Sequence, residues 1–424
     1  MKLSAKTALV SIALASIGVS RSASAQLNMS VEIDKPPISY SDTLDNNRVT
    51  RLIDDIASGK VKLTYSPDHG YLKSLLEALE ISESSQTLVF SKTSMQVQHI
   101  SGRNPRAVFF NDDTYVAWIR GSSLIEMSTT DPKLGAAFYT VDMRPSQAKV
   151  KRSNYDCLGC HSTSMTAGVP GHTVRSVYPN YDGSVRSQSE SFVSGHHSPF
   201  SQRWGGWYVT GLHGDMAHMG NAFLRGTTLD TKNNANRMNL RNDFDTSGYL
   251  SPYSDIVALM VLEHQTQMHN VMTKADFAVR KLIHDREQSD LKFDSDEWQA
   301  QMHLVAREVV DHLLLRDEVL LTDKVQGSVV FEADFVSRGP KDDFGRSLRD
   351  FDLKTRIFKY PCSYLIYSDA FNSLQPVLRT EIYRQLRLSL TGNDASGRYS
   401  HLDEATRSNI LAILRSTKPD FADQ

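Results

Sequence analysis

Thr87-Leu88-Val89-Phe90 is the first of four short apolar runs that decide the fold of this 424-residue chain. All four are rich in β-branched and aromatic residues, and turn-forming stretches such as Asn-Asp-Asp and Asp-Pro separate them. The other three are Ala107-Val108-Phe109-Phe110, Tyr115-Val116-Ala117-Trp118-Ile119 and Ala136-Ala137-Phe138-Tyr139-Thr140-Val141. Closely spaced runs of this kind predict a small antiparallel sheet between Gln86 and Asp142.

The segments around these runs have helical periodicity. Before the sheet, helices are predicted at residues 47–58 and 68–80. After it, helices are predicted at residues 254–284, 294–315, 374–390 and 402–414. The sequence therefore predicts an α+β fold. A small N-terminal antiparallel sheet region is followed by a loop-rich region and a mainly α-helical C-terminal half.

The N-terminus has the three parts of a secretory signal peptide. Lys2 and Lys6 make a basic start, an uncharged apolar stretch runs from Thr7 to Val19, and Ala23-Ser24-Ala25 is a small-residue cleavage site. We therefore expect residues 1–25 to be removed by cleavage near Ala25. The remaining chain would then be exported, to the periplasm or beyond.

Charge and hydropathy narrow the class of partner. The formal net charge is −2, and the predicted signal peptide holds basic but no acidic residues, so the exported part is more acidic still. This balance argues against nucleic acid or an anionic membrane surface as the main partner. After the signal peptide, no stretch is long and apolar enough to predict a membrane span.

Cys157-Leu158-Gly159-Cys160-His161 is the attachment motif of a c-type haem. The two thiols add to the two vinyl groups of the porphyrin, and the histidine that follows becomes the proximal ligand of the iron. The motif occurs once, so we expect one covalently bound haem c. Export supports this interpretation, because covalent haem attachment is completed outside the cytoplasm.

Two other chemistries use a Cys-x-x-Cys pair, and both stay open beside haem. A dithiol redox centre needs a strand–helix context of the thioredoxin kind, but this stretch is rich in Ser, Asn and Gly. A structural zinc site needs four ligands. The only other cysteine, Cys362, lies in an apolar setting that is typical of a buried, inert thiol.

The occupant of the second axial position of the iron decides the function. Histidine or methionine there favours electron transfer, whereas an open position permits peroxide or substrate chemistry. We expect the distal ligand or a catalytic group among His196, His213 and His218, which crowd a segment rich in glycine and aromatic residues. His264 is a further candidate, because it falls in the apolar stripe of a predicted helix. The same histidines are also suited to a second metal such as copper or zinc.

Four more residues are predicted to line the haem. Arg175 and Arg203 are candidate partners of the propionates, because guanidinium pairs well with carboxylate. Trp204 and Trp207 are expected to pack against the porphyrin. Surface exposure to water is the competing interpretation of both arginines. The chain then divides into a mixed region with short strands (26–145), a haem-binding region (146–290) and a helical region (291–424).

The motif resembles the c-type cytochrome superfamily, and the wider chain resembles a family of large, exported, single-haem bacterial cytochrome c domain proteins. The matching stretches are Phe90-Ser91-Lys92-Thr93-Ser94, Asn104-Pro105-Arg106-Ala107, residues 203–211 and residues 359–367. The resemblance implies haem binding and a redox role but names no substrate. The chain departs from small soluble carriers in its sheet-containing N-terminal region and in lacking an evident methionine ligand in a short C-terminal loop.

These observations lead to one main hypothesis and two alternatives. The main hypothesis is a soluble exported cytochrome that transfers electrons to or from a redox partner protein or a small-molecule donor or acceptor. The first alternative is a haem c-dependent oxidoreductase, peroxidase-like or similar, with an open distal site. The second is a redox or gas sensor in which a ligand change at the iron alters a partner surface. The sequence leaves both enzymatic activity and the oligomeric state open.

Overall fold

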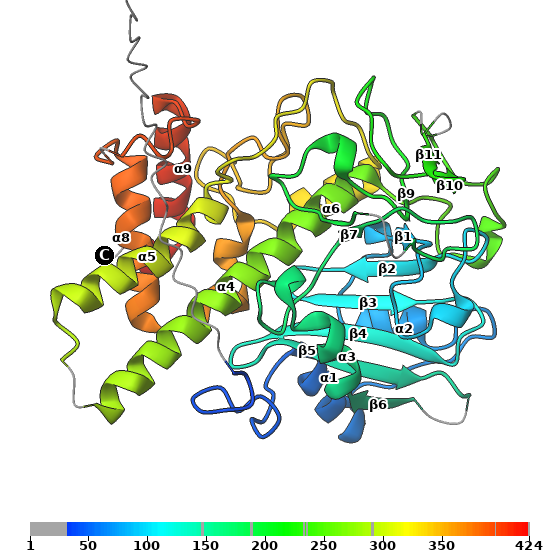
Figure 1. The fold of residues 1–424 in the computed structure, drawn as a ribbon, viewed down its shortest axis with the longest axis horizontal. Coiled ribbons are helices and arrows are strands. Elements are labelled where there is room, and N and C mark those ends of the chain that lie inside the picture. Colours follow the sequence, from blue (N-terminus) through cyan, green and yellow to red (C-terminus); the bar gives the residue numbers. More distant parts are fainter. Residues whose placement is uncertain are drawn as a thin grey trace, which may run out of the picture.

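The computed structural model describes residues 32–145, 148–186, 190–231, 234, 236–289, 292–394 and 396–422. The predicted signal peptide, residues 1–25, lies outside the described residues. Within the described part, the chain forms a sheet flanked by helices (Figure 1). None of the helices described there combines the length and the apolar character needed to cross a membrane.

A seven-stranded antiparallel sheet forms the centre of the N-terminal half, in the order β6-β5-β4-β3-β2-β1-β9. Every neighbouring pair in it runs antiparallel, and β1 to β6 follow one another along the sheet in chain order. The strands are β1 (Thr87–Val89), β2 (Arg106–Phe110), β3 (Thr114–Trp118), β4 (Leu124–Asp131), β5 (Gly135–Asp142), β6 (Lys149–Arg152) and β9 (Trp207–Tyr208).

Two short strand pairs lie outside this sheet, β7 (Arg175–Ser176) with β8 (Phe192–Val193), and β10 (Phe223–Arg225) with β11 (Thr228–Asp230). Most of the helices follow the strands in the chain. They are α1 (Arg48–Ala57), α2 (Leu72–Ala78), α3 (Tyr155–His161), α4 (Ile256–Gln288), α5 (Asp296–Leu313), α6 (Val329–Ser337), α7 (Asp369–Asn372), α8 (Pro376–Leu390), α9 (Glu404–Thr417) and α10 (Pro419–Ala422).

The two faces of the sheet are covered by different parts of the chain. Side chains alternate along β4, so Ile125 and Met127 share one face while Glu126 and Ser128 share the other. The first face packs against α1 and α2. The second faces α4, and α3 lies over it near β4 and β5 (Figure 1). The candidate motif is therefore carried on the face of the sheet that looks toward the C-terminal helices.

Helix α4 runs through the core of the molecule. It spans 33 residues and is buried along most of its length. The apolar cluster around it joins the sheet to α5, α8 and α9, so residues from all three predicted regions pack together. The helix also brings polar side chains into the core, because Glu263, His264 and Gln265 are each no more than 1% exposed. Such groups must be hydrogen-bonded to be tolerated there.

The four predicted strands and the longer predicted helices are confirmed, but the predicted sheet was too small. The alternating strand β4 was missed, and β6 and β9 come from the segment predicted as loop-rich. Strand β9 has only two residues, which pair with β1 in the register Leu88↔Tyr208 and Val89↔Trp207. Two residues carry no periodic pattern, so this strand exists only through its tertiary pairing.

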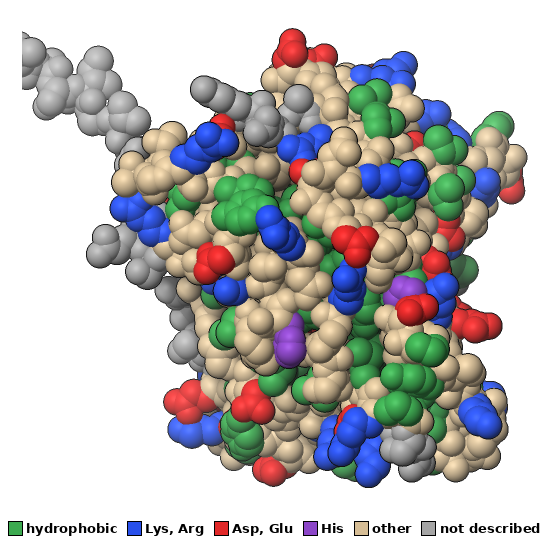
Figure 2. Space-filling view, turned by 90° about the vertical axis from the view of Figure 1, so that its right-hand side faces the viewer, with side chains coloured by type: hydrophobic (Ala, Val, Ile, Leu, Met, Phe, Trp, Pro, Cys, Tyr) green, Lys and Arg blue, Asp and Glu red, His purple; other side chains and the backbone are tan. Residues whose placement is uncertain are grey.

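Charged side chains of both signs are mixed on the face of the molecule that Figure 2 shows. Lysine and arginine side chains lie there among aspartate and glutamate side chains, with apolar groups between them. Mixed charges of this kind create no field of one sign over that face.

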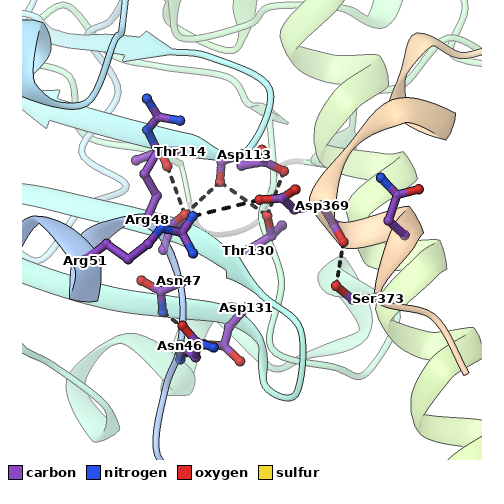
Figure 3. A network of polar contacts seen from close by, with 12 residues as sticks. Asn46, Asn47, Arg48, Arg51, Asp113, Thr114, Thr130, Asp131, Asp369 and Ser373 are labelled. Atoms are coloured by element: carbon purple, nitrogen blue, oxygen red, sulfur yellow. Dashed lines mark hydrogen bonds and ion pairs between the residues drawn. The ribbon is translucent and has the colours of Figure 1, made fainter.

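A polar network joins α1, the turn between β2 and β3, the end of β4, and α7 (Figure 3). The backbone carbonyl of Asp113 accepts a hydrogen bond from the amide of Thr130 (2.9 Å), and its carboxylate accepts one from the Thr130 hydroxyl (3.2 Å). Arg51 pairs with Asp369 across the network, at 3.8 Å. Burial, followed by the charges of Asp112 and Asp369, raises the pKa of Asp113 to about 7.

This raised pKa predicts a pH-dependent stability. The native carboxyl holds its proton up to about pH 7, whereas the unfolded one loses it near pH 4. The stabilising contribution is therefore complete below about pH 4 and is lost as the pH rises through 7. Asp113→Asn should raise the free energy of unfolding by on the order of 3 kcal/mol more at pH 8 than at pH 4, where the native carboxyl is protonated and the unfolded one is partly so. Urea denaturation at both pH values measures the difference.

Asp42→Asn is the control, because it removes an exposed carboxylate in the same part of the chain. It should leave the pH dependence as in the wild type. An Asp113→Asn protein whose stability changes equally at both pH values would contradict the assignment.

Candidate functional site

Helix α3 presents the motif at the surface. None of its residues is buried, and Cys157 is half-buried while Cys160 is exposed. Both thiols are free, and their spacing of three residues places them on the same side of one helical turn. A Cβ atom built on Gly159 meets nothing within 4 Å, so the turn between the thiols stands in open space.

His161 is the last residue of α3, and a hydrogen bond fixes the tautomer of its ring. Its Nδ1 lies 3.0 Å from the carbonyl oxygen of Gly171. A carbonyl only accepts hydrogen bonds, so Nδ1 carries the proton and Nε2 keeps its lone pair. Burial lowers the pKa of His161, which keeps the ring neutral. The ring also packs on Phe138 of β5, with 4.9 Å between centroids. This geometry leaves the lone pair of Nε2 available as a metal ligand.

Charged side chains of the sheet lie next to the motif. Arg106 of β2 pairs with Glu126 of β4 at 2.9 Å, and both are less than one-fifth exposed. Gln96 also donates to Glu126, at 3.0 Å. The charge of Arg106 lowers the pKa of His161 while that of Glu126 raises it, so both act on the imidazole. Burial raises the pKa of Cys157, and Glu126 adds to that effect.

His196 and His264 form a hydrogen-bonded chain of their own. His196 Nε2 lies 3.3 Å from the Arg316 carbonyl, so that nitrogen donates and His196 Nδ1 accepts. His264 Nδ1 then donates to His196 Nδ1 (3.1 Å), and His264 Nε2 accepts from the Ser363 hydroxyl (2.8 Å). Burial lowers the pKa of His264 to about 3. Every ring nitrogen in this chain is used, which is how a core tolerates neutral histidine.

His213 and His218 form a second pair. His218 Nδ1 accepts from the amide of Gly220 (3.0 Å), so its Nε2 carries the proton and donates to His213 Nε2 at 3.3 Å. Burial lowers the pKa of His218 to about 3 and thereby keeps it neutral. A nitrogen that holds a proton does not ligate a metal. Among the described residues, no hydrogen bond or ring contact joins these two histidines, or His196 and His264, to His161.

The residues predicted to line the haem are placed differently from one another. Arg203 is 3% exposed and bonds Glu263 (2.6 Å), the Ser198 carbonyl (2.9 Å) and the His196 carbonyl (3.1 Å). All three of its donor nitrogens are therefore occupied. Trp204 is fully buried and donates to Glu263 at 3.1 Å. Both side chains therefore make their hydrogen bonds within the buried core and not to a group at the surface.

Arg175 and Trp207 are joined to each other near β7. The Trp207 indole donates to the Arg175 carbonyl at 2.8 Å. The Arg175 side chain is half-buried and donates to Ser191 (3.2 Å), while its Nε has no partner among the described residues. Of the two predicted arginines, Arg175 thus retains a donor for an anionic group.

The neighbours of His161 in space were not found from the sequence. Phe138 contacts both His161 and His172, with 6.4 Å between its ring and the His172 ring. Burial, followed by the charges of His269 and His161, lowers the pKa of His172 well below its usual value. The His172 and His269 rings lie 5.8 Å apart. These imidazoles come from a loop and from α4, about a hundred residues apart in the chain, so no local pattern connects them.

No protein-family model, curated protein or solved structure matches this chain. In the described ranges, no group of three or more His, Cys, Asp or Glu side chains is arranged to hold a metal ion. A haem needs fewer ligands from the protein, because the porphyrin supplies four of the iron ligands and the protein only the axial ones. We therefore base the function on the motif and its contacts.

The buried ion pair beside these histidines predicts a large effect on stability. Arg203 and Glu263 are 3% and 0% exposed. Glu263→Gln should lower the free energy of unfolding by about 3–5 kcal/mol, because it leaves the arginine charge buried and unpaired. Chemical denaturation measures the loss.

Asp285→Asn is the matched control on the same helix. It breaks the exposed pair of Lys281 with Asp285 (2.9 Å) and should lower stability by less than about 0.5 kcal/mol. Similar small losses in the two variants would show that the Arg203–Glu263 pair does not hold this part of the core.

Proposed function

We propose that this protein is an exported c-type cytochrome with one covalent haem, and that it transfers electrons. The observation that carries the proposal is the hydrogen bond from His161 Nδ1 to the Gly171 carbonyl (3.0 Å). It orients the ring and leaves Nε2 unprotonated, as an axial iron ligand requires. The attachment motif and the predicted export support the same conclusion.

The residues present fit a haem c. Cys157 and Cys160 would hold it through thioether bonds, and His161 would supply one axial nitrogen. Both thiols are free, and the space over Gly159 is open. Arg106 would pair with a propionate, because its charge acts on His161 and its Nε has no partner among the described residues. When bound, the group supplies reversible one-electron exchange at its iron.

Electron transfer fits the position of the motif better than catalysis on a bound substrate. A haem attached to an unburied helix keeps an edge at the surface, where a partner protein or a small-molecule donor or acceptor reaches it. Of the histidines considered for distal catalysis, His196, His218 and His264 use both ring nitrogens in hydrogen bonds to other histidines, to the backbone or to Ser363. His213 uses Nε2 in this way, while its Nδ1 has no partner among the described residues. These contacts leave the distal ligand of the proposed haem unassigned among the described residues, so an oxidoreductase with an open distal site is the alternative that the spectra below would reveal.

The first test concerns covalent attachment. Protein exported together with a haem-attachment system should retain haem on a denaturing gel and show one added haem in its intact mass, on a chain cleaved near Ala25. The double variant Cys157→Ser with Cys160→Ser should lose all covalent haem, because no thioether can form.

Cys362→Ala is the control for cysteine removal. Cys362 is fully buried, and burial raises its pKa to about 12, so its thiol is inert. This variant should carry as much covalent haem as the wild type. A wild-type chain that is exported without haem would overturn the proposed function.

The second test separates an electron carrier from an enzyme. We expect low-spin ferric and ferrous spectra that carbon monoxide and peroxide leave unchanged, because a carrier keeps both axial positions of its iron filled. A high-spin ferric spectrum and a fast reaction with peroxide would indicate a peroxidase-like activity instead of electron transfer. Either result leaves the attachment site itself intact.

A further inference from the structure

The side chain of Asn270 on helix α4 holds the backbone of the loop behind His161. The Asn270 amide is 1% exposed and binds both backbone groups of His172. Its Oδ1 accepts from the His172 amide at 2.8 Å, and its Nδ2 donates to the His172 carbonyl at 2.7 Å. A single side chain thus fixes the backbone of a residue that is 98 positions away in the chain.

The same amide lies directly against Gly171. A Cβ atom added to Gly171 would come within 2.2 Å of Asn270 Oδ1 and within 3.0 Å of the Thr166 Cβ. No side chain fits in that space, so glycine is required for close approach rather than for an unusual backbone conformation. Gly171 and His172 are therefore held against α4 as one rigid unit.

His161 is bonded to this unit in both directions. The Gly171 amide donates to the His161 carbonyl at 2.9 Å, and the Gly171 carbonyl accepts from His161 Nδ1 at 3.0 Å. The direction and length of the bond at Nδ1 therefore depend on where the Gly171 peptide sits. Asn270 sets that position, because it binds the backbone of the next residue, His172.

We propose that Asn270 is a positioning residue for His161, and that through Gly171 it sets the electron donation of the imidazole to a bound iron. This inference rests on the proposed function. A hydrogen bond donated by Nδ1 makes the ring a stronger donor at Nε2. Stronger donation favours the ferric state and holds the reduction potential down. Displacement of the Gly171 carbonyl weakens the bond and raises the potential.

The test compares Asn270→Ala with a control that removes the same kind of contact elsewhere. The Asn221 side chain binds the backbone of Val209 as Asn270 binds that of His172. Its Oδ1 accepts from the Val209 amide and its Nδ2 donates to the Val209 carbonyl, each at 2.8 Å. Asn221 has φ +62°, so alanine there is strained as well and loses at least as much stability. No hydrogen bond joins Asn221 to α3 or to the Gly171–His172 unit within the described ranges.

We expect both substitutions to lower the stability of the protein but only one of them to change the midpoint potential of the haem. Both variants should be less stable than the wild type and should keep covalent haem. Only Asn270→Ala should shift the midpoint potential, and the shift should be toward more positive values. It should also speed exchange of the His172 amide hydrogen by roughly tenfold or more, since a buried hydrogen bond is lost. Equal potentials in Asn270→Ala and Asn221→Ala would overturn the inference.

A second variant covers the case in which Asn270→Ala does not fold. Gly171→Ala keeps Asn270 but forces its amide away from the loop, and it should shift the potential in the same direction. An unchanged potential in this variant would also overturn the inference. A wild type without haem would instead refute the proposed function, and amide exchange at His172 would still show whether Asn270 holds the loop.

Discussion

The structure depends on the hydrogen bonding of polar side chains along helix α4. This helix is buried on most sides, yet it carries two carboxylates, two histidines and two amides through the core. A buried polar group without a partner costs about 1–3 kcal/mol, so each of these groups demands a specific neighbour. Glu263 takes Arg203 and Trp204, while Gln265 accepts from Tyr364 at 2.6 Å. These bonds dock the loops and the C-terminal helices onto α4.

The same requirement separates the histidines into two kinds. His196, His264 and His218 have both ring nitrogens hydrogen-bonded, to other histidines, to the backbone or to Ser363. His213 bonds His218 through Nε2, while its Nδ1 has no partner among the described residues. Their proton positions follow from the fixed donors and acceptors at the ends of each chain. His161 differs, because among the described residues its ring makes one hydrogen bond, to a carbonyl, and it lies on a surface helix. Hydrogen-bond direction, rather than the local density of histidines, is therefore the basis on which we propose His161 as the iron ligand.

An exposed attachment helix on a rigid base suits a protein that exchanges electrons. The sheet supplies Phe138 and the Arg106–Glu126 pair on one side of His161. The Gly171 loop, held by α4, supplies the carbonyl on another side. A fixed ligand changes little in geometry when the charge of the iron changes. The large size of the chain has the same explanation, because the sheet and α4 together form the frame that holds one histidine.

The sequence by itself determined the local features. Periodicity located the main strands and helices, and the Cys157–His161 motif supplied the haem hypothesis without any knowledge of the fold. Local patterns failed for the two-residue strand β9 and for the choice among the other histidines. The tertiary structure decided those, together with the grip of Asn270 on the loop behind His161. The physical reason is that a hydrogen bond across 98 positions depends on how helices and loops pack, and a periodic pattern reports only which face of one element is buried.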